Sequence, residues 1–216
     1  TGTYKDQNVA GDVLLVAVGR KPNTAALDLA RAGVKTDERG TIPVDAQGRT
    51  NVASIFAVGD LVTGSIQLAH AATQQGEAAV EAAAGLKSHV EKLCPSCIFT
   101  SPEIGLAGLT EAKAQQLGLT VKTATFPFSA LGKAMAAGET DGFVKWICDA
   151  ASGQVLGAQA VGAHATELIA EAALAIRNEL TVDEVGRTIH SHPTMSEAWM
   201  EAAHAFHNAC IHLPKR

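Results

Sequence analysis

Apolar residues follow different patterns in the two halves of the chain. In the first half, continuous apolar runs at residues 12–18 and 54–58 are typical of strands buried on both faces, as in a parallel sheet. Residues 25–32 predict one short helix. Residues 68–84, rich in alanine and glutamate, predict a long helix that ends at Gly85. We therefore expect a partial α/β segment, in which strands and helices alternate.

The pattern changes at residues 86–97, which are more polar, and we place a domain boundary there. Beyond it, short apolar runs predict strands at residues 98–101, 104–108, 121–126, 143–148 and 155–161. A hairpin loop at residues 150–153 joins the last two strands. Helices are predicted at residues 110–118, 165–178 and 196–210. This order predicts an α+β domain with an antiparallel sheet and flanking helices.

Composition and charge exclude several classes of function. The 216 residues suffice for one large or two modest domains, and the net charge of −5 without long runs of one sign argues against nucleic acid as the main partner. No apolar stretch approaches the length that spans a bilayer, and the N-terminus is neither a signal nor a transit peptide. It also lacks an initiator Met, so we expect a piece of a longer protein. Four cysteines favour a reduced compartment, the bacterial cytoplasm or the mitochondrial matrix.

Side chains suited to proton transfer are most concentrated in residues 190–197, His-Ser-His-Pro-Thr-Met-Ser-Glu. Histidine titrates closest to neutral pH, and a carboxylate that fixes its tautomer makes it a better base. Pro193 fixes its own φ and excludes His192 from helical geometry, so His192 is predicted on a stiff extended turn before a helix. We expect Glu197 to lie roughly 2.6–3.2 Å from one ring nitrogen of His192.

The same residues also fit a purely structural role. Thr194-x-x-Glu197 before an apolar run is a capping box, which starts a helix and carries no chemistry. In that case the Glu197 carboxylate points to the backbone amide of Thr194, and His192 is a free turn residue. Spacing alone does not separate the two roles, although a proline and two histidines exceed what a helix start requires.

Two features of the first half suit ligand binding. Asp60 follows the predicted strand at residues 54–58, at the edge where α/β folds bind ligands, although it could simply cap a loop. The N-terminus of the predicted helix at residues 68–84 suits an anionic or electron-rich group. No G-x-G-x-x-G follows a strand and no Walker loop or serine elbow occurs, so most phosphate-binding machinery is absent.

Two groups of side chains have redox or metal spacing, and we interpret both as structural. Cys94 and Cys97 are spaced like a redox dithiol, but residues 98–100 read as strand, whereas a redox pair usually opens a helix. Four possible metal ligands gather near the C-terminus: His204, His207, Cys210 and His212. They suit zinc or copper, but no carboxylate is placed to orient the rings, so we predict no metal.

Several motifs together resemble the pyridine nucleotide–disulfide oxidoreductase family. In the first half these are Val18-Gly19-Arg20-Lys21-Pro22-Asn23-Thr24, Thr50-Asn51-Val52, Ile55-Phe56-Ala57-Val58-Gly59-Asp60 and Leu68-Ala69-His70. In the second half they are Phe99-Thr100-Ser101-Pro102-Glu103, Phe126-Pro127-Phe128-Ser129, Gly142-Phe143-Val144-Lys145, Leu156-Gly157-Ala158 and Glu167-Leu168-Ile169. Residues 192–197 are most similar to the dihydrolipoamide dehydrogenase branch, whereas glutathione reductases usually carry a second acidic residue there.

The resemblance covers nearly the whole chain but only the C-terminal half of the family. The glycine fingerprints for FAD and NAD and the redox-active cysteine pair would precede residue 1. Cys94 and Cys97 fall where relatives carry apolar residues, so they are not that pair. The resemblance implies three parts: the end of an NAD-binding domain, the later part of the FAD-binding and central region, and the dimerisation domain, at residues 1–22, 23–90 and 91–216.

The resemblance also implies cofactors for the full-length enzyme, FAD and NAD. Asp60 would bond a ribityl hydroxyl of FAD. The backbone of the residues that start the following helix would face the pyrimidine edge of the flavin: Leu68, Ala69 and His70. We expect the isolated chain to retain neither cofactor, to be colourless and to be inactive.

For residues 190–197 the resemblance implies a base that works across a dimer. His192 would take a proton from dihydrolipoamide, with Glu197 holding its other ring nitrogen and a cis bond before Pro193. We also expect an isologous homodimer, supported by an apolar stripe that would equally suit a monomer core: Trp199, Ala202, Ala203 and Phe206. The alternatives are a stand-alone dimerisation module without a cofactor, or another family member such as a glutathione reductase.

Overall fold

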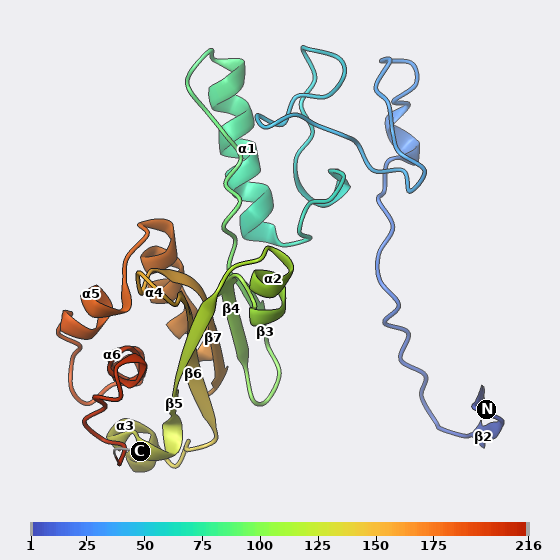
Figure 1. The fold of residues 1–216 in the computed structure, drawn as a ribbon. Coiled ribbons are helices and arrows are strands. Elements are labelled where there is room, and N and C mark those ends of the chain that lie inside the picture. Colours follow the sequence, from blue (N-terminus) through green and yellow to red (C-terminus); the bar gives the residue numbers. More distant parts are fainter. Residues whose placement is uncertain (1, 215–216) are drawn as a thin grey trace. The chain divides into compact units, whose positions relative to one another are not determined.

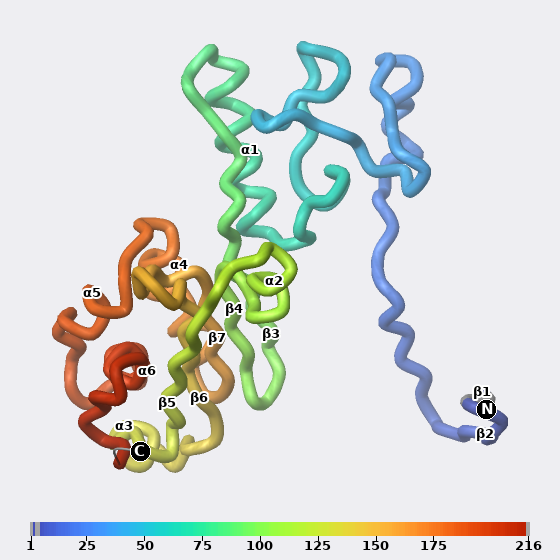
Figure 2. Tube along the Cα trace, in the orientation of Figure 1, coloured from blue at the N-terminus to red at the C-terminus, as the bar shows by residue number. Residues whose placement is uncertain are grey.

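The computed structural model describes residues 2–214. Two compact units make up the chain, Thr1–Val90 and Glu91–Arg216. Figure 1 labels their helices and strands, and Figure 2 traces the same path from the N-terminus to the C-terminus.

A five-stranded antiparallel sheet organises the second unit, in the spatial order β3-β4-β7-β6-β5. Its strands are β3 (Ser96–Ile98), β4 (Ile104–Gly108), β5 (Val121–Pro127), β6 (Gly142–Asp149) and β7 (Val155–Gly162). The predicted hairpin joins β6 to β7, where Gly153 donates its N–H to the Asp149 carbonyl at 3.0 Å. The antiparallel α+β fold predicted for this half is confirmed.

Two helices cover one face of this sheet, α4 (Ala165–Arg177) against β4 and β7, and α6 (Glu197–Phe206) against β5 and β6 (Figure 1). Shorter elements complete the unit: α2 (Glu111–Gln116), η3 (Phe128–Ala130), α3 (Gly132–Ala137) and α5 (Val182–Arg187). Thr110 caps α2, as predicted, by accepting the Lys113 N–H at 3.2 Å.

Two tryptophans form the centre of the core between the sheet and the helices. Trp146 of β6 and Trp199 of α6 are fully buried, with ring centroids 4.3 Å apart. Each indole N–H donates to a backbone carbonyl at 3.0 Å, Trp146 to that of Trp199 and Trp199 to that of Leu168. The pair therefore connects β6, α6 and α4 without leaving a buried donor unsatisfied.

Close backbone approaches explain two glycines in this core. A Cβ on Gly105 of β4 would lie 2.4 Å from the Ala165 carbonyl at the start of α4. A Cβ on Gly157 of β7 would lie 1.9 Å from the carbonyl of Leu109. Only glycine allows α4 to approach β4 this closely and the chain after β4 to cross over β7.

The first unit has less regular structure. It contains a short hairpin of β1 (Gly2–Tyr4) and β2 (Gln7–Val9), two 3₁₀ turns, η1 (Ala25–Leu27) and η2 (Gly59–Leu61), and the helix α1 (Ala69–Ala83). α1 agrees with the helix predicted at residues 68–84 and is followed by Gly85 at φ 74°. Its buried face consists mainly of alanines.

The strand predicted at residues 12–18 is not formed. This segment has no regular structure, and the side chains of Val13 and Val18 are 90% and 92% exposed. A strand that is apolar on both faces is buried only when neighbouring strands pair with it and helices cover it. Among residues 2–214 no strand pairs with this segment, so the prediction is wrong for the chain by itself.

Two other predictions in this unit are also wrong. Residues 54–58 make one isolated bridge, Phe56 with Arg49, rather than a strand, because no second segment pairs beside it. Residues 25–32 form only η1, because Asp28 adopts a left-handed φ of 48° that ends the turn. Asp tolerates that conformation better than most residues.

Differences in the second unit are smaller. The first strand lies at β3 rather than at residues 98–101, since β3 pairs with β4 and Phe99 beyond it is 80% exposed. α6 ends at Phe206 rather than at residue 210, because Asn208 takes a left-handed φ of 55°. α3 and α5 were not predicted, although a capping box at Thr181 and Glu184 marks the start of α5.

The apolar stripe of α6 does not support the dimer. All four side chains belong to the core of their own unit: Trp199, Ala202, Ala203 and Phe206. The stripe therefore has the ordinary role of a helix face on a sheet, and any subunit contact must use other residues.

Within the described residues, none of the helices combines the length and the apolar character needed to cross a bilayer.

Candidate active site

His192 lies in the loop between α5 and α6 and contacts Glu197, the first residue of α6. Its Nδ1 is 2.9 Å from the Glu197 Oε1. The His192 side chain is 75% exposed, whereas that of Glu197 is 12% exposed. A carboxylate oxygen can only accept, so Nδ1 carries the proton and, in the neutral ring, Nε2 carries the free lone pair.

Glu197 also performs the capping role, with its other oxygen. Its Oε2 accepts the backbone N–H of Thr194 at 2.8 Å. Burial opposes ionisation of Glu197, but the bonds from Thr194 and His192 outweigh burial and lower the pKa of this carboxyl. The two roles that the sequence left open are therefore filled at once, one by each oxygen.

Two further features describe the loop before α6. The His192–Pro193 peptide bond is cis, as the family resemblance implied. The Thr194 hydroxyl donates to the Ser191 carbonyl at 2.6 Å, which folds the loop back on itself. The full capping box is not formed, because Ser196 is the N-cap of α6 and makes no side-chain cap bond.

The predicted cofactor residues lie together in the first unit. Asp60 is exposed in η2, and η2 packs against α1. Gly59 donates its N–H to Gln75 Oε1 of α1 at 2.6 Å, and a Cβ on Gly59 would lie 3.2 Å from that of Ala72. The absence of a side chain on Gly59 thus lets the turn that carries Asp60 sit against the first turns of α1.

The start of α1 fits an electron-rich ligand group. Leu68 is the N-cap, with no side-chain cap, and Ala69 and His70 are exposed. The first amides of a helix lack intrahelical acceptors and carry the positive end of its dipole. The Asp60 carboxylate, which can accept hydrogen bonds from hydroxyl groups, lies in η2 beside the same helix, so the first unit holds both donors and an acceptor that suit such a group.

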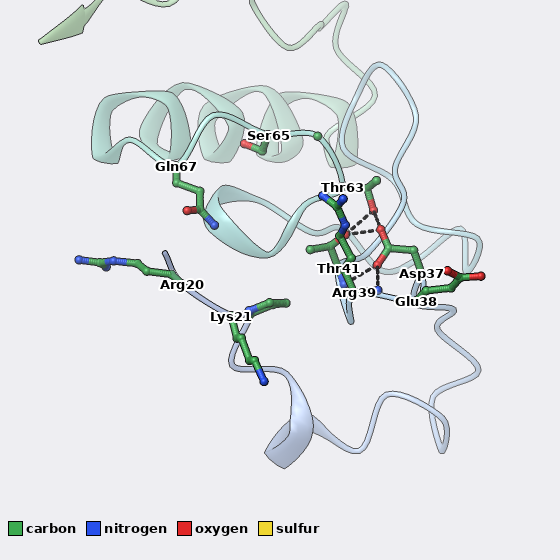
Figure 3. A pocket seen from close by; sticks show the side chains of 11 residues that line it. Arg20, Lys21, Asp37, Glu38, Arg39, Thr41, Thr63, Ser65 and Gln67 are labelled. Atoms are coloured by element: carbon green, nitrogen blue, oxygen red, sulfur yellow. Dashed lines mark hydrogen bonds between the residues drawn. The ribbon is translucent and has the colours of Figure 1, made fainter. Parts of the chain in front are cut away.

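A separate cavity of about 800 Å³ in the first unit was not anticipated (Figure 3). Asp37 lies on its wall and accepts hydrogen bonds from the backbone of Arg39 and Thr41 and from the hydroxyls of Thr41 and Thr63. These bonds, the Thr41 hydroxyl foremost, lower the pKa of Asp37. The side chain orders a turn, and neither Asp60 nor His192 lines the cavity.

The two cysteine interpretations can be compared with the geometry. Cys94 and Cys97 are free thiols, and Cys97 lies in β3. Burial raises the pKa of both thiols, and Glu103 and Glu167 raise that of Cys97 further. A redox dithiol needs a lowered thiol pKa, so this environment supports the structural interpretation.

The C-terminal histidines do not converge on one point. His204 contacts the Gly186 carbonyl at 3.0 Å, His207 contacts Asp183 at 2.6 Å, and His212 contacts Glu201 at 2.7 Å. Within residues 2–214, no three His, Cys, Asp or Glu side chains are grouped so that they could hold a metal ion. The idea of a shared metal site on this helix is therefore not supported.

Two family models match the chain. The model of the pyridine nucleotide-disulphide oxidoreductase dimerisation domain matches residues 94–203, and that of pyridine nucleotide-disulphide oxidoreductase matches residues 2–76. The chain belongs to the pyridine nucleotide-disulphide oxidoreductase family.

Members of this family with assigned activities are similar over nearly all of the chain. A dihydrolipoyl dehydrogenase of Chlamydia muridarum is 48% identical over 204 residues, covering 94% of this chain and 44% of that protein. The dihydrolipoyl dehydrogenase of Bacillus subtilis is 42% identical over 212 residues, covering 98% of this chain and 45% of that protein. The chain thus spans less than half the length of these relatives.

Solved structures of the oxidoreductase family share the fold. LpdA from Mycobacterium tuberculosis has a TM-score of 0.80 and 32% identity, over 85% of this chain and 40% of that chain. The HOCl-induced flavoprotein disulfide reductase RclA from Escherichia coli has a TM-score of 0.81 and 28% identity, over 91% and 45%.

Proposed function

We propose that this chain is the part of a flavin-dependent dihydrolipoamide dehydrogenase that supplies the proton-accepting base and the subunit contact. The observation that carries the proposal is the His192–Glu197 pair, in which Nδ1 and Oε1 are 2.9 Å apart. The similarity to dihydrolipoyl dehydrogenases supports the choice of a dithiol substrate over other substrates of the family.

His192 is the base in this proposal. With Nδ1–H held by Glu197, the exposed Nε2 accepts a proton from the thiol of dihydrolipoamide, and the thiolate is then the reactive nucleophile. The imidazolium that forms is stabilised by the Glu197 carboxylate, whose pKa is already lowered. Glu197 thus orients the ring before proton transfer and balances its charge afterwards.

The cofactors belong to the complete enzyme. In that enzyme FAD and NAD⁺, when bound, would supply the redox chemistry that takes up the electron pair of the dithiol. Asp60 and the backbone of Leu68, Ala69 and His70 hold the flavin in this proposal. The proposed domain limits follow: residues 1–22 end the NAD-binding domain, residues 23–90 belong to the FAD-binding and central region, and residues 91–216 form the dimerisation domain.

The proposed partner is a second copy of the chain. The match of residues 94–203 to a dimerisation domain supports a homodimer. In this proposal His192 serves the active site of the other subunit. A reduced compartment, the bacterial cytoplasm or the mitochondrial matrix, is part of the same proposal. Residues 1–216 by themselves are proposed to be colourless and inactive, which an absorbance spectrum and a dithiol oxidation assay test directly.

The base is tested in the complete enzyme with His192→Gln and Glu197→Gln. His192→Gln should lower dihydrolipoamide turnover by about 10²- to 10⁴-fold, the usual contribution of a general base. Glu197→Gln should lower it less, because the imidazole remains. Flavin absorbance and dimer mass should be unchanged in both variants.

His207→Gln is the matched control, because it removes another imidazole from a His–carboxylate pair at the far end of α6. It should retain full turnover. Normal dihydrolipoamide oxidation by the His192 variant would remove the basis of the proposal.

A further inference from the structure

His190 has a buried side chain, whereas the residues nearest to it in the loop, 189 and 191–193, are exposed. Its side chain is 5% exposed, whereas the neighbouring Ile189 is 95% exposed and His192 is 75% exposed. An imidazole is half polar, so its burial at this point of a surface loop requires hydrogen-bond partners.

Both ring nitrogens of His190 have acceptors. Nε2 is 2.6 Å from Oε1 of Glu171 on α4, and Nδ1 is 2.9 Å from the Thr188 carbonyl. Neither acceptor can donate, so only the doubly protonated ring satisfies both contacts. The hydrogen bond to Glu171 raises the pKa of His190 in spite of its burial, with further contributions from the charge of Glu171, the Thr188 carbonyl and the charge of Glu197.

These contacts attach the loop to α4. On the downstream side, His192 contacts Glu197, the first residue of α6, which also accepts the N–H of Thr194 in the loop. On the upstream side, α5 ends at Arg187, and the bond from His190 to Glu171 is the contact that ties the loop to another helix. Only Ser191 separates His190 from His192, so a displacement of one ring moves the other.

We propose that His190 is a positioning residue, which fixes the upstream side of the His192 loop by bridging Glu171 of α4 and the Thr188 carbonyl. The inference rests on the proposed function, since it assigns His190 a part in aligning the His192 base. The charged groups that act on His190 are Glu171 from α4 and Glu197 from α6. His190 itself does not touch the substrate in this proposal.

A positioning role predicts a loss in kcat rather than in KM. Misplacement of a reacting group by about 1 Å can cost on the order of 10²-fold in rate. Phenylalanine fills the space of the imidazole but donates to neither acceptor, so His190→Phe in the complete enzyme should lower kcat by about 10- to 100-fold with little change in KM. Glu171→Gln keeps an acceptor but removes the charge and should have a smaller effect in the same direction.

Two measurements on residues 1–216 distinguish this role from the proposed function. Amide hydrogen exchange across residues 188–196 should accelerate in His190→Phe. The NMR titration midpoint of the His190 ring should lie above the ordinary value of about 6.5 and return toward it in Glu171→Gln. Glu167→Gln, one turn earlier on α4 and exposed, is the control and should change neither quantity.

A lower kcat together with faster amide exchange in the loop supports the positioning role. Control-like kcat and exchange in both His190→Phe and Glu171→Gln would overturn it. If the unmodified complete enzyme oxidises no dithiol, the proposed function fails while the exchange and titration data still decide whether His190 holds the loop. If His190→Phe does not fold, the Glu171 variant decides.

Discussion

Residues 91–216 bury both tryptophans of the chain between the sheet and the helices that cover it, whereas residues 1–90 leave their most apolar run, residues 12–18, open to solvent. The second unit is built from antiparallel strands that follow one another closely, so each strand finds its partners within the same unit. A parallel-type strand needs neighbours and covering helices that come from elsewhere in the sequence. The comparison shows that an apolar pattern specifies burial only where its partners are present.

The largest expected effect tests the core of the second unit. Trp199→Ala removes a fully buried indole and should lower the free energy of unfolding by about 3–5 kcal/mol. Fluorescence of the remaining Trp146 reports the transition, because both tryptophans of the chain lie in this unit.

The same variant should leave hydrogen exchange in α1 unchanged, since none of the described residues 2–90 belongs to the core that contains Trp199. Accelerated exchange in α1 would mean that the two units share stability, which breaks the comparison.

A backbone contact gives the next effect. Gly157→Ala would place a Cβ 1.9 Å from the Leu109 carbonyl, so β7 or the chain after β4 must shift. Such overpacking typically costs about 1–3 kcal/mol in unfolding free energy, which chemical denaturation monitored by tryptophan fluorescence measures. Gly132→Ala is the control, because its Cβ would meet no atom within 4 Å, and a similar loss there would contradict the steric explanation.

A helix cap gives a smaller effect in the same unit. Thr181→Ala removes the capping box of α5, in which the Thr181 hydroxyl and the Glu184 carboxylate each bond the backbone of the other. Loss of such a cap costs about 1 kcal/mol. Thermal unfolding should show the loss, and Thr181→Ser, which keeps the hydroxyl, should recover most of the difference.

The smallest effect is expected in the exposed run of the first unit. Leu14→Ser changes an apolar side chain that is 85% exposed, and surface substitutions usually alter stability by less than about 0.5 kcal/mol. Denaturant unfolding followed by circular dichroism measures the change. A loss above 1 kcal/mol would mean that residues 12–18 are covered in solution, for example by association with another apolar surface.

The same contrast explains how far the sequence could predict the fold. α1, α4 and the strands β4 to β7 were predicted closely because their signals are local, a helical or alternating apolar pattern bounded by glycines or caps. Residues 12–18 and 54–58 carried an equally clear apolar signal, but their structure depends on partners that no local pattern encodes. Short elements such as α3 were missed because six residues carry too little periodicity.

The candidate site shows a similar division. The contact between His192 and Glu197 could be predicted because the two residues lie five positions apart around a proline. The contact between His190 and Glu171 spans 19 positions and depends on how α4 packs, so it could not be predicted from sequence spacing. The Asp37 turn was overlooked, although Asp followed by backbone donors two and four residues later is a recognisable local motif.

Glu201 gives α6 a mechanical property. One turn after Glu197, this carboxylate is 1% exposed and contacts the His212 ring at 2.7 Å and the Ile211 N–H at 3.0 Å. α6 therefore contacts the segment before it through Glu197 and the segment after it through Glu201, two residues one turn apart on the helix. Any rotation of α6 about its axis would displace both segments together, so a spectroscopic label on the segment after α6 would report movements of the loop that carries His192.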